Sequence, residues 1–217
     1  MRANQIALPV DELPRKWYNV QADLPEPLPP PKEPDDGISR RDFLERTMIR
    51  ECLRQESSAD RWIPIPEEVL DLYAQVGRPR PLYRALKLEQ FLRLKKTRIY
   101  YKREDLSPTG SHKTNTAIAQ AHFATKEGKR TLVTETGAGQ WGTALAHAAR
   151  LMGTDCVVFW VRSVYDWKLD RRTLMNLLGA VVHASPSKET EIGRTLLSKD
   201  ADHNGSLGIA VSEGLEY

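Results

Sequence analysis

The sequence predicts an α/β fold in which a parallel sheet carries helices on both of its faces. From residue 98 onward, strand-like runs with many β-branched and aromatic residues alternate with helical runs rich in alanine and leucine. Gly153 and Gly179 stand where a helical run gives way to a strand-like one, which is typical of consecutive βαβ units. Because parallel strands are joined by right-handed crossovers, the connecting helices are expected to cover both faces.

The first 60 residues are expected to form a proline-rich arm and a helix. Trp17 and Tyr18 predict a short segment that docks on the body of the protein, because large aromatic side chains favour burial. Residues 24–36 are rich in proline and are therefore expected to run as an extended surface strap. Ser39 resembles an N-cap, and apolar residues at helical spacing as far as Leu53 predict one helix after it.

Residues 61–217 are expected to form a larger domain. Its first helix covers 67–76 and ends at Gly77, and Arg78 and Arg80, placed between prolines, are expected in a surface turn. The further strands are expected at 98–101, 131–136, 155–161 and 180–183, and the further helices at 113–124, 143–152, 168–178, 188–197 and from 206 onward.

Lys113 stands at the start of a predicted helix, which is an unusual position for a lysine. The positive end of the helix dipole disfavours a second cation and favours anions. An uncharged lysine amine in that place can form a Schiff base with an aldehyde such as pyridoxal phosphate, and the neighbouring His112 can then serve the phosphate. The alternative is an ordinary solvated lysine at a helix start.

A second strand, loop and helix follow the first in the same arrangement. The predicted strand 131–136 leads into glycines at 137, 139 and 142, and this arrangement places free backbone N–H groups at a helix N-terminus, ready for an anion. Glu135 lies at the edge of that anion site and is a candidate proton shuttle, since anionic neighbours and desolvation ease protonation of a carboxylate. A dinucleotide-binding glycine turn is the alternative, but the next strand ends at Val161 without an acid for a ribose.

These two stretches resemble the tryptophan synthase β chain, more narrowly its second type, in which Trp141 stands where the common type has histidine. The motifs are Lys-Arg-Glu-Asp-Leu-x-Pro-Thr-Gly-Ser-His-Lys-x-Asn at 102–115 and Glu-Thr-Gly-Ala-Gly-Gln-Trp-Gly at 135–142. The resemblance covers residues 63–217 and implies a pyridoxal-phosphate enzyme of fold type II. Other members of that fold type, such as cysteine synthase and threonine synthase, are the sibling alternative.

The resemblance also implies a role for each motif residue. Lys113 is the Schiff-base lysine and Glu135 the acid and base, while His112 and Asn115 are expected beside the cofactor. The amino-acid carboxylate is expected on a loop of six residues: Thr136, Gly137, Ala138, Gly139, Gln140 and Trp141.

The implied reaction converts L-serine, or O-phosphoserine, and indole into L-tryptophan. Replacement of histidine by Trp141 leaves the choice of serine donor open. The family's β chains continue for about as long again and there carry the loop that cradles the cofactor phosphate. The chain is thus expected to be the N-terminal half of a homodimeric enzyme, with a tryptophan synthase α chain as a possible partner. Two alternatives stay open: a non-catalytic remnant or complementing half, and a truncated copy of a longer gene.

Composition argues against several other classes of function. The net charge of +3 arises from 32 basic and 29 acidic residues that are dispersed along the chain, which gives no case for nucleic acid. No apolar run reaches the length of a membrane span, and no histidine pair has zinc-ligand spacing. The two cysteines, Cys52 and Cys156, indicate reduced thiols of a cytoplasmic chain.

Overall fold

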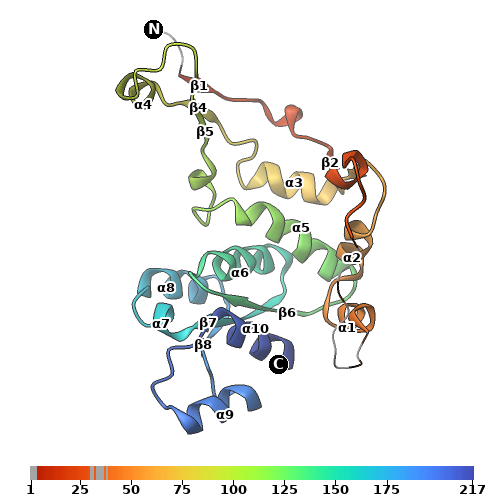
Figure 1. Ribbon diagram of the computed structural model, residues 1–217, viewed down its shortest axis with the longest axis vertical. Coiled ribbons are helices and arrows are strands. Elements are labelled where there is room, and N and C mark those ends of the chain that lie inside the picture. Colours follow the sequence, from red (N-terminus) through yellow and green to blue (C-terminus); the bar gives the residue numbers. More distant parts are fainter. Residues whose placement is uncertain (1–3, 30–31, 33–36, 38) are drawn as a thin grey trace.

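The centre of the fold is a three-stranded parallel sheet, seen in the computed structural model of Figure 1, which describes residues 4–29, 32, 37 and 39–217. Its strands lie in chain order: β6 (Thr131–Thr136), β7 (Asp155–Val161) and β8 (Val181–Ser185). The predicted bounds of β6 and β7 are confirmed. β7 is buried from its second residue onward because it has a strand on either side and helices on both faces.

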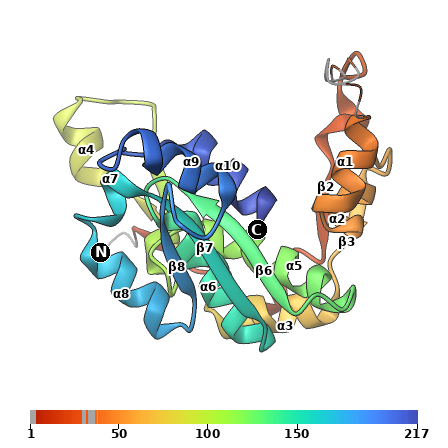
Figure 2. The ribbon, with the colours of Figure 1, turned by 90° about the horizontal axis from the view of Figure 1, so that it is seen from below.

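Helices cover both faces of this sheet, as the sequence predicts. Figure 2 shows α6 (Gln140–Met152) and α8 (Leu169–Leu177) on one face and α10 (Leu207–Glu216) on the other. α5 (Lys113–Lys126) packs along α6, and α9 (Glu191–Lys199) packs on α10. The closely packed faces of α5 and α6 are lined by buried alanines, whose small side chains let two helix backbones approach.

Two small antiparallel sheets precede the parallel one. β1 (Gln5–Ile6), β4 (Leu82–Arg84) and β5 (Tyr100–Lys102) form one, and β2 (Lys16–Tyr18) and β3 (Trp62–Pro64) form the other. The other helices are α1 (Arg40–Thr47), α2 (Arg50–Glu56), α3 (Glu67–Gln75), α4 (Leu86–Phe91) and α7 (Arg162–Tyr165), with short 3₁₀ turns at Val10–Glu12, Val20–Asp23 and Glu104–Leu106.

The N-terminal segment docks on the body through Trp17, as predicted. The ring of Trp17 lies edge-on to Phe123 of α5, with centroids 6.2 Å apart, while Tyr18 contacts Trp62 and stays half exposed. Of the predicted proline-rich strap, residues 24–29 and 32 are described; they form no helix or strand, and residues 25–29 are exposed, whereas 30, 31 and 33–36 lie outside the described residues. How the chain divides at residue 60 stays a prediction.

The single helix expected after Ser39 is wrong, because the chain forms two helices there. Ser39 caps α1 as predicted, its hydroxyl accepting from the backbone N–H of Asp42, but Met48 is extended and ends the helix. Phe43 and Met48 are both more than 40% exposed, so the apolar spacing does not correspond to one buried face. α2 then begins at Arg50, after the extended residues Met48 and Ile49.

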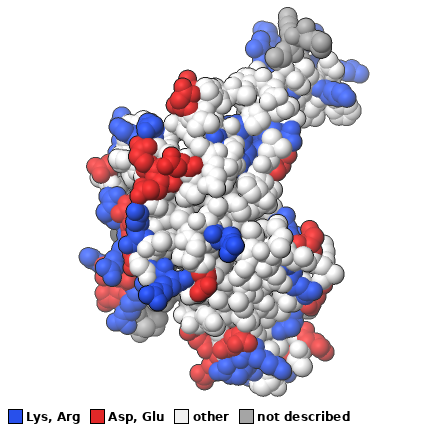
Figure 3. Space-filling view, turned by 180° about the vertical axis from the view of Figure 1, so that it is seen from behind, with Lys and Arg blue, Asp and Glu red and all other residues white. Residues whose placement is uncertain are grey.

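The surface carries no continuous field of one charge on the face seen in Figure 3, where basic and acidic side chains intermingle and a broad central area carries neither. Among the helices of the described ranges, none is long and apolar enough to cross a membrane. The described residues likewise contain no group of three or more His, Cys, Asp or Glu side chains able to hold a metal ion.

Candidate active site

The first turn of α5 is held in place by hydroxyl groups on its buried side. Ser107 Oγ accepts from the backbone N–H of Ser111 and donates to its carbonyl, both at 2.7 Å. Ser111 Oγ in turn accepts from the backbone N–H of Lys113 at 3.2 Å. Lys113 is the first residue of α5, as predicted, and its side chain is half buried, whereas His112 is exposed. The loop therefore presents a lysine amine from a fixed backbone.

Two polar groups of Asn115 form hydrogen bonds, and a third has no partner among the described residues. Its Nδ2 donates to Glu104 Oε2 at 3.0 Å, and its carbonyl accepts from the Tyr73 hydroxyl at 2.8 Å. Its side-chain oxygen Oδ1 is buried without a hydrogen-bond partner among the described residues. A buried acceptor without a donor is costly, so this atom indicates a place for a donor from a bound molecule.

Arg80 does not lie in a surface turn, which corrects the prediction made from its neighbouring prolines. Its side chain is only 1% exposed and donates to the carbonyls of Val76 and Gly77. These carbonyls lie at the C-terminal end of α3 and accept no hydrogen bond from an N–H of the helix. The buried guanidinium supplies the donors that they lack. Its Nε lies 3.9 Å from Glu104 Oε2, which connects the end of α3 to the Asn115 contact.

The predicted substrate loop, residues 136–141, is a tight turn that only glycine permits at its centre. Gly139 is the N-cap of α6 and has a left-handed φ of +88°, and a Cβ there would lie 2.6 Å from Trp160 Cζ2. Trp160, which is fully buried at the end of β7, donates from Nε1 to the carbonyl of Gly137 at 2.8 Å. Thr136 Oγ1 accepts from the backbone N–H of Gly142 at 3.2 Å. Strand, loop and helix are thereby joined into one rigid unit.

The backbone N–H groups of Gln140 and Trp141 have no acceptor among the described residues. They belong to the first turn of α6, where free N–H groups and the helix dipole favour an anion. The indole N–H of Trp141 is not available to an anion there, because its Nε1 donates to Thr134 Oγ1 at 2.7 Å. The backbone and not this side chain is therefore the donor that the loop offers.

Glu135 is half buried on β6 and has little to hold its carboxylate. Its closest recorded contact joins Oε2 to Thr134 Oγ1 at 3.4 Å, near the limit of a hydrogen bond. Thr134 and Thr136 bond to α6, so the alternation of side chains along a strand turns Glu135 to the face that α10 covers. The carboxylate is thus free for a further proton donor.

The two candidate stretches lie at the same edge of the fold. α5 and α6 run side by side from the left of Figure 1, so Lys113 and the loop before α6 are both found at that edge. No hydrogen bond or ion pair joins Lys113 to Glu135 in the described part of the chain. A reaction that uses both side chains therefore needs a bound molecule between them.

Some residues of this region were missed by sequence reasoning. Trp160 and Arg171 both contact Gly139, and Tyr73 holds the carbonyl of Asn115. The position of Trp160 near the carboxyl end of β7 is a signal that could have identified it, because neighbouring parallel strands end at the same edge. Arg171 and Tyr73 carry no comparable signal, since their closeness depends on helix packing.

A cleft of about 420 Å³ opens on the other side of α5. Its walls combine the aromatic side chains of Trp17, Tyr73 and Phe123 with the polar side chains of Gln55 and Asn115. Cys52 also lines it, and burial raises the pKa of this thiol to about 11, which keeps it protonated and unreactive. The cleft therefore combines aromatic with polar side chains, and its thiol is not a nucleophile.

Comparison with known proteins identifies the relatives of this sequence. Residues 73–212 match the family described as pyridoxal-phosphate dependent enzyme. The chain is 54% identical over 213 residues to tryptophan synthase beta chain 2 of Methanothermobacter thermautotrophicus, covering 98% of this chain and 49% of that one. It is 50% identical to tryptophan synthase beta chain 1 of Sulfurisphaera tokodaii, covering 95% and 49%, and 50% identical to beta chain 2 of Pyrococcus furiosus, covering 98% and 48%.

The chain thus spans about half the length of the curated relatives it matches. Among solved structures, a pyridoxal 5'-phosphate-dependent aspartate racemase aligns with 63% of this chain and 45% of its own length, at 22% identity and a TM-score of 0.45. That likeness is too low to support any conclusion about the site.

Proposed function

Since this chain belongs to the tryptophan synthase beta chain family of pyridoxal-phosphate dependent enzymes, we propose that it is the N-terminal part of a lyase that joins L-serine, or O-phosphoserine, to indole. The observation that carries the proposal is the arrangement of two helix starts at one edge. One start presents Lys113 and the other presents the free N–H groups of Gln140 and Trp141. An amine and an anion site so placed suit an amino acid that must be held while its Cα–H bond is broken.

The residues at the start of α5 fit the cofactor of this family, pyridoxal 5'-phosphate. Lys113 supplies a primary amine for its aldehyde. Asn115 lies two residues further along the helix and lines the cleft on its other side, so its place beside the cofactor stays a prediction. The exposed His112 can donate to its phosphate. When bound, the cofactor supplies an electron sink that stabilises negative charge at the substrate Cα.

The loop and its neighbours then have separate tasks. The N–H groups of Gln140 and Trp141 hold the substrate carboxylate, and Gly139 lets the backbone approach it without a side chain in the way. Lys113 takes the proton from Cα. Glu135, whose carboxylate is uncommitted, gives a proton to the departing β-oxygen and accepts one as indole adds.

The partners of the whole protein are also proposals. We expect it to act on small molecules, to form a homodimer and to be open to a tryptophan synthase α chain. A second proposal is that the chain works only when docked to a separate C-terminal chain. Co-expression with such a chain, followed by size-exclusion chromatography, would then give a stable complex, and two separate peaks would count against it.

Reductive labelling tests the leading proposal. The protein is mixed with pyridoxal 5'-phosphate and reduced with borohydride, and the modified peptide is mapped by mass spectrometry. We expect selective labelling of Lys113 that falls when L-serine is added first. Lys113→Arg should abolish it, whereas the matched control Lys126→Arg, at the far end of the same helix and exposed beside Glu68, should leave it unchanged. Labelling spread over surface lysines in all three proteins would reject the proposal.

A further inference from the structure

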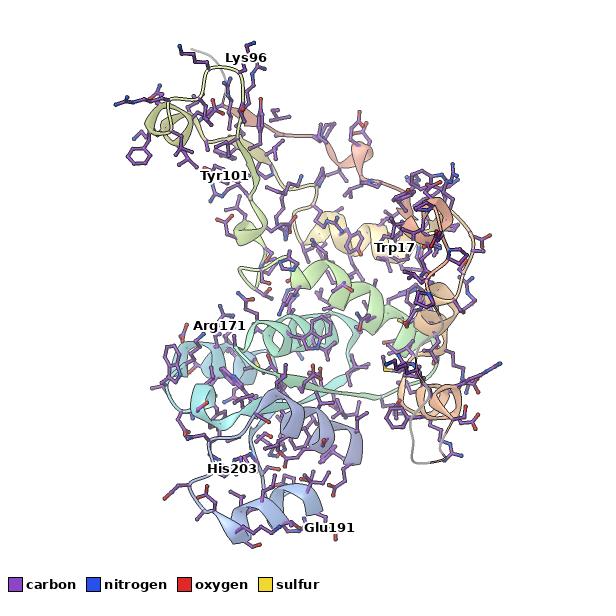
Figure 4. All side chains as sticks on the ribbon, in the orientation of Figure 1. Trp17, Lys96, Tyr101, Arg171, Glu191 and His203 are labelled. Atoms are coloured by element: carbon purple, nitrogen blue, oxygen red, sulfur yellow. The ribbon has the colours of Figure 1, made fainter. Side chains whose placement is uncertain are left out.

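Arg171 lies directly on the loop that we propose to hold the substrate carboxylate. Its Cδ is 3.0 Å from the place where a Cβ would stand on Gly139, so its stem packs against the centre of the loop. Figure 4 labels Arg171 where α8 meets the start of α6. The side chain thereby brings a full positive charge to a turn that otherwise offers only backbone donors.

Arg171 is half buried, and it has neither an ion pair nor a hydrogen bond with any residue that the structure describes. The two arginines nearest to it in the chain are both engaged. The guanidinium of Arg172 lies 4.6 Å from the ring centre of Tyr165, and Arg162 donates to the carbonyls of Ala184 and Pro186. A guanidinium has five donors and is favoured where carboxylates or phosphates are recognised. Arg171 is thus an unpaired cation beside unpaired N–H groups.

We propose that Arg171 is a specificity-determining residue that binds an anionic group of the amino-acid substrate together with the N–H groups of Gln140 and Trp141. This inference rests on the proposed function, because that function assigns the loop to a substrate. Two anions fit the chemistry: the α-carboxylate that every amino acid carries, and the phosphate of a phosphorylated serine. A fixed positive charge at the loop attracts either of them.

The test compares Arg171→Gln with Arg171→Lys and with the matched control Arg172→Gln. All variants are made in the protein as its gene encodes it. Tryptophan formation from indole is measured with L-serine and with O-phosphoserine as the varied substrate. Because the contact is made before and during the reaction, we expect Arg171→Gln to raise KM at least tenfold with kcat within about twofold. Arg171→Lys should recover part of the loss, and Arg172→Gln should leave KM unchanged.

The two substrates identify the anion. An equal rise in KM for both assigns Arg171 to the carboxylate, and a rise for O-phosphoserine alone assigns it to the phosphate. Unchanged KM for both in Arg171→Gln, or an equal rise in Arg172→Gln, would overturn the inference. Reductive labelling of Lys113 is performed on the same samples, because its failure rejects the proposed function itself and not the role of Arg171 alone.

Discussion

Replacing Gly139 by alanine should destabilise the protein more than any simple backbone effect can explain. The left-handed backbone at Gly139 costs a residue with a Cβ about 1–2 kcal/mol. The new methyl group would also stand 2.6 Å from Trp160 Cζ2 and 3.0 Å from Arg171 Cδ, and overpacking of a core typically costs about 1–3 kcal/mol. Trp160 is fully buried and cannot move aside. The expected decrease in the free energy of unfolding is about 2–5 kcal/mol.

Gly153→Ala provides the matched control. Gly153 has a left-handed φ of +69° at the end of the same helix, but a Cβ there would meet nothing within 4 Å. Gly153→Ala should therefore lower the free energy of unfolding only by the cost of the left-handed backbone, about 1–2 kcal/mol. Both variants are unfolded in urea and followed by tryptophan fluorescence. Equal losses in the two variants would refute the reasoning, since the clash with Trp160 and Arg171 is all that separates them.

Three more predictions follow from contacts near the site and behind it. Trp160→Phe removes the indole donor to Gly137 while keeping an aromatic ring, so we expect a loss of about 1–2 kcal/mol in urea unfolding. Glu213→Ala leaves three donors on Oε1 without an acceptor in a fully buried place, so we expect a larger loss, about 3–5 kcal/mol, and partial recovery in Glu213→Gln. Burial raises the pKa of Cys52 to about 11 and that of Cys156 to about 12. At pH 8, alkylation by iodoacetamide should therefore be slower than in the urea-unfolded chain by about 200-fold at Cys52 and about 2000-fold at Cys156.

Each of these predictions has an outcome that contradicts it. A Trp160→Phe protein as stable as the parent would show that the carbonyl of Gly137 finds another donor. Equal stability of Glu213→Ala and Glu213→Gln would mean that Oε1 is not the acceptor that matters. Rapid alkylation of either cysteine in the folded chain, measured by mass spectrometry against pH, would show that the thiols are exposed to solvent.

The sequence predicts the parallel half of this fold well, because its signals there are local. β6 and β7 are runs rich in β-branched and aromatic residues and bounded by turns, and both were predicted with the bounds that the structure has. Lys113 was predicted to begin a helix because the alanine-rich run 116–124 follows it. The roles assigned to Lys113, Glu135 and the loop are still predictions, since they concern molecules that bind between these elements.

The rest could not be predicted, because it depends on tertiary contacts. Arg80 looks like a surface residue between prolines, yet it is buried where the carbonyls at the end of α3 need donors. The helix expected after Ser39 breaks at Met48, although the apolar spacing continues past it. Arg171 is separated from Gly139 along the chain by α6, β7 and α7, so only the packing of α8 against α6 brings them together.

The strand pair formed by β2 and β3 has a practical consequence for anyone who shortens the gene. The family match begins at residue 73, but Leu13, Ile65 and Val69 all belong to the same apolar core as α5 and α6. A version cut at the match boundary would expose the flank of α5 that Trp17 now shields. Such a version is expected to accumulate in inclusion bodies, so expression trials should retain the residues ahead of β2.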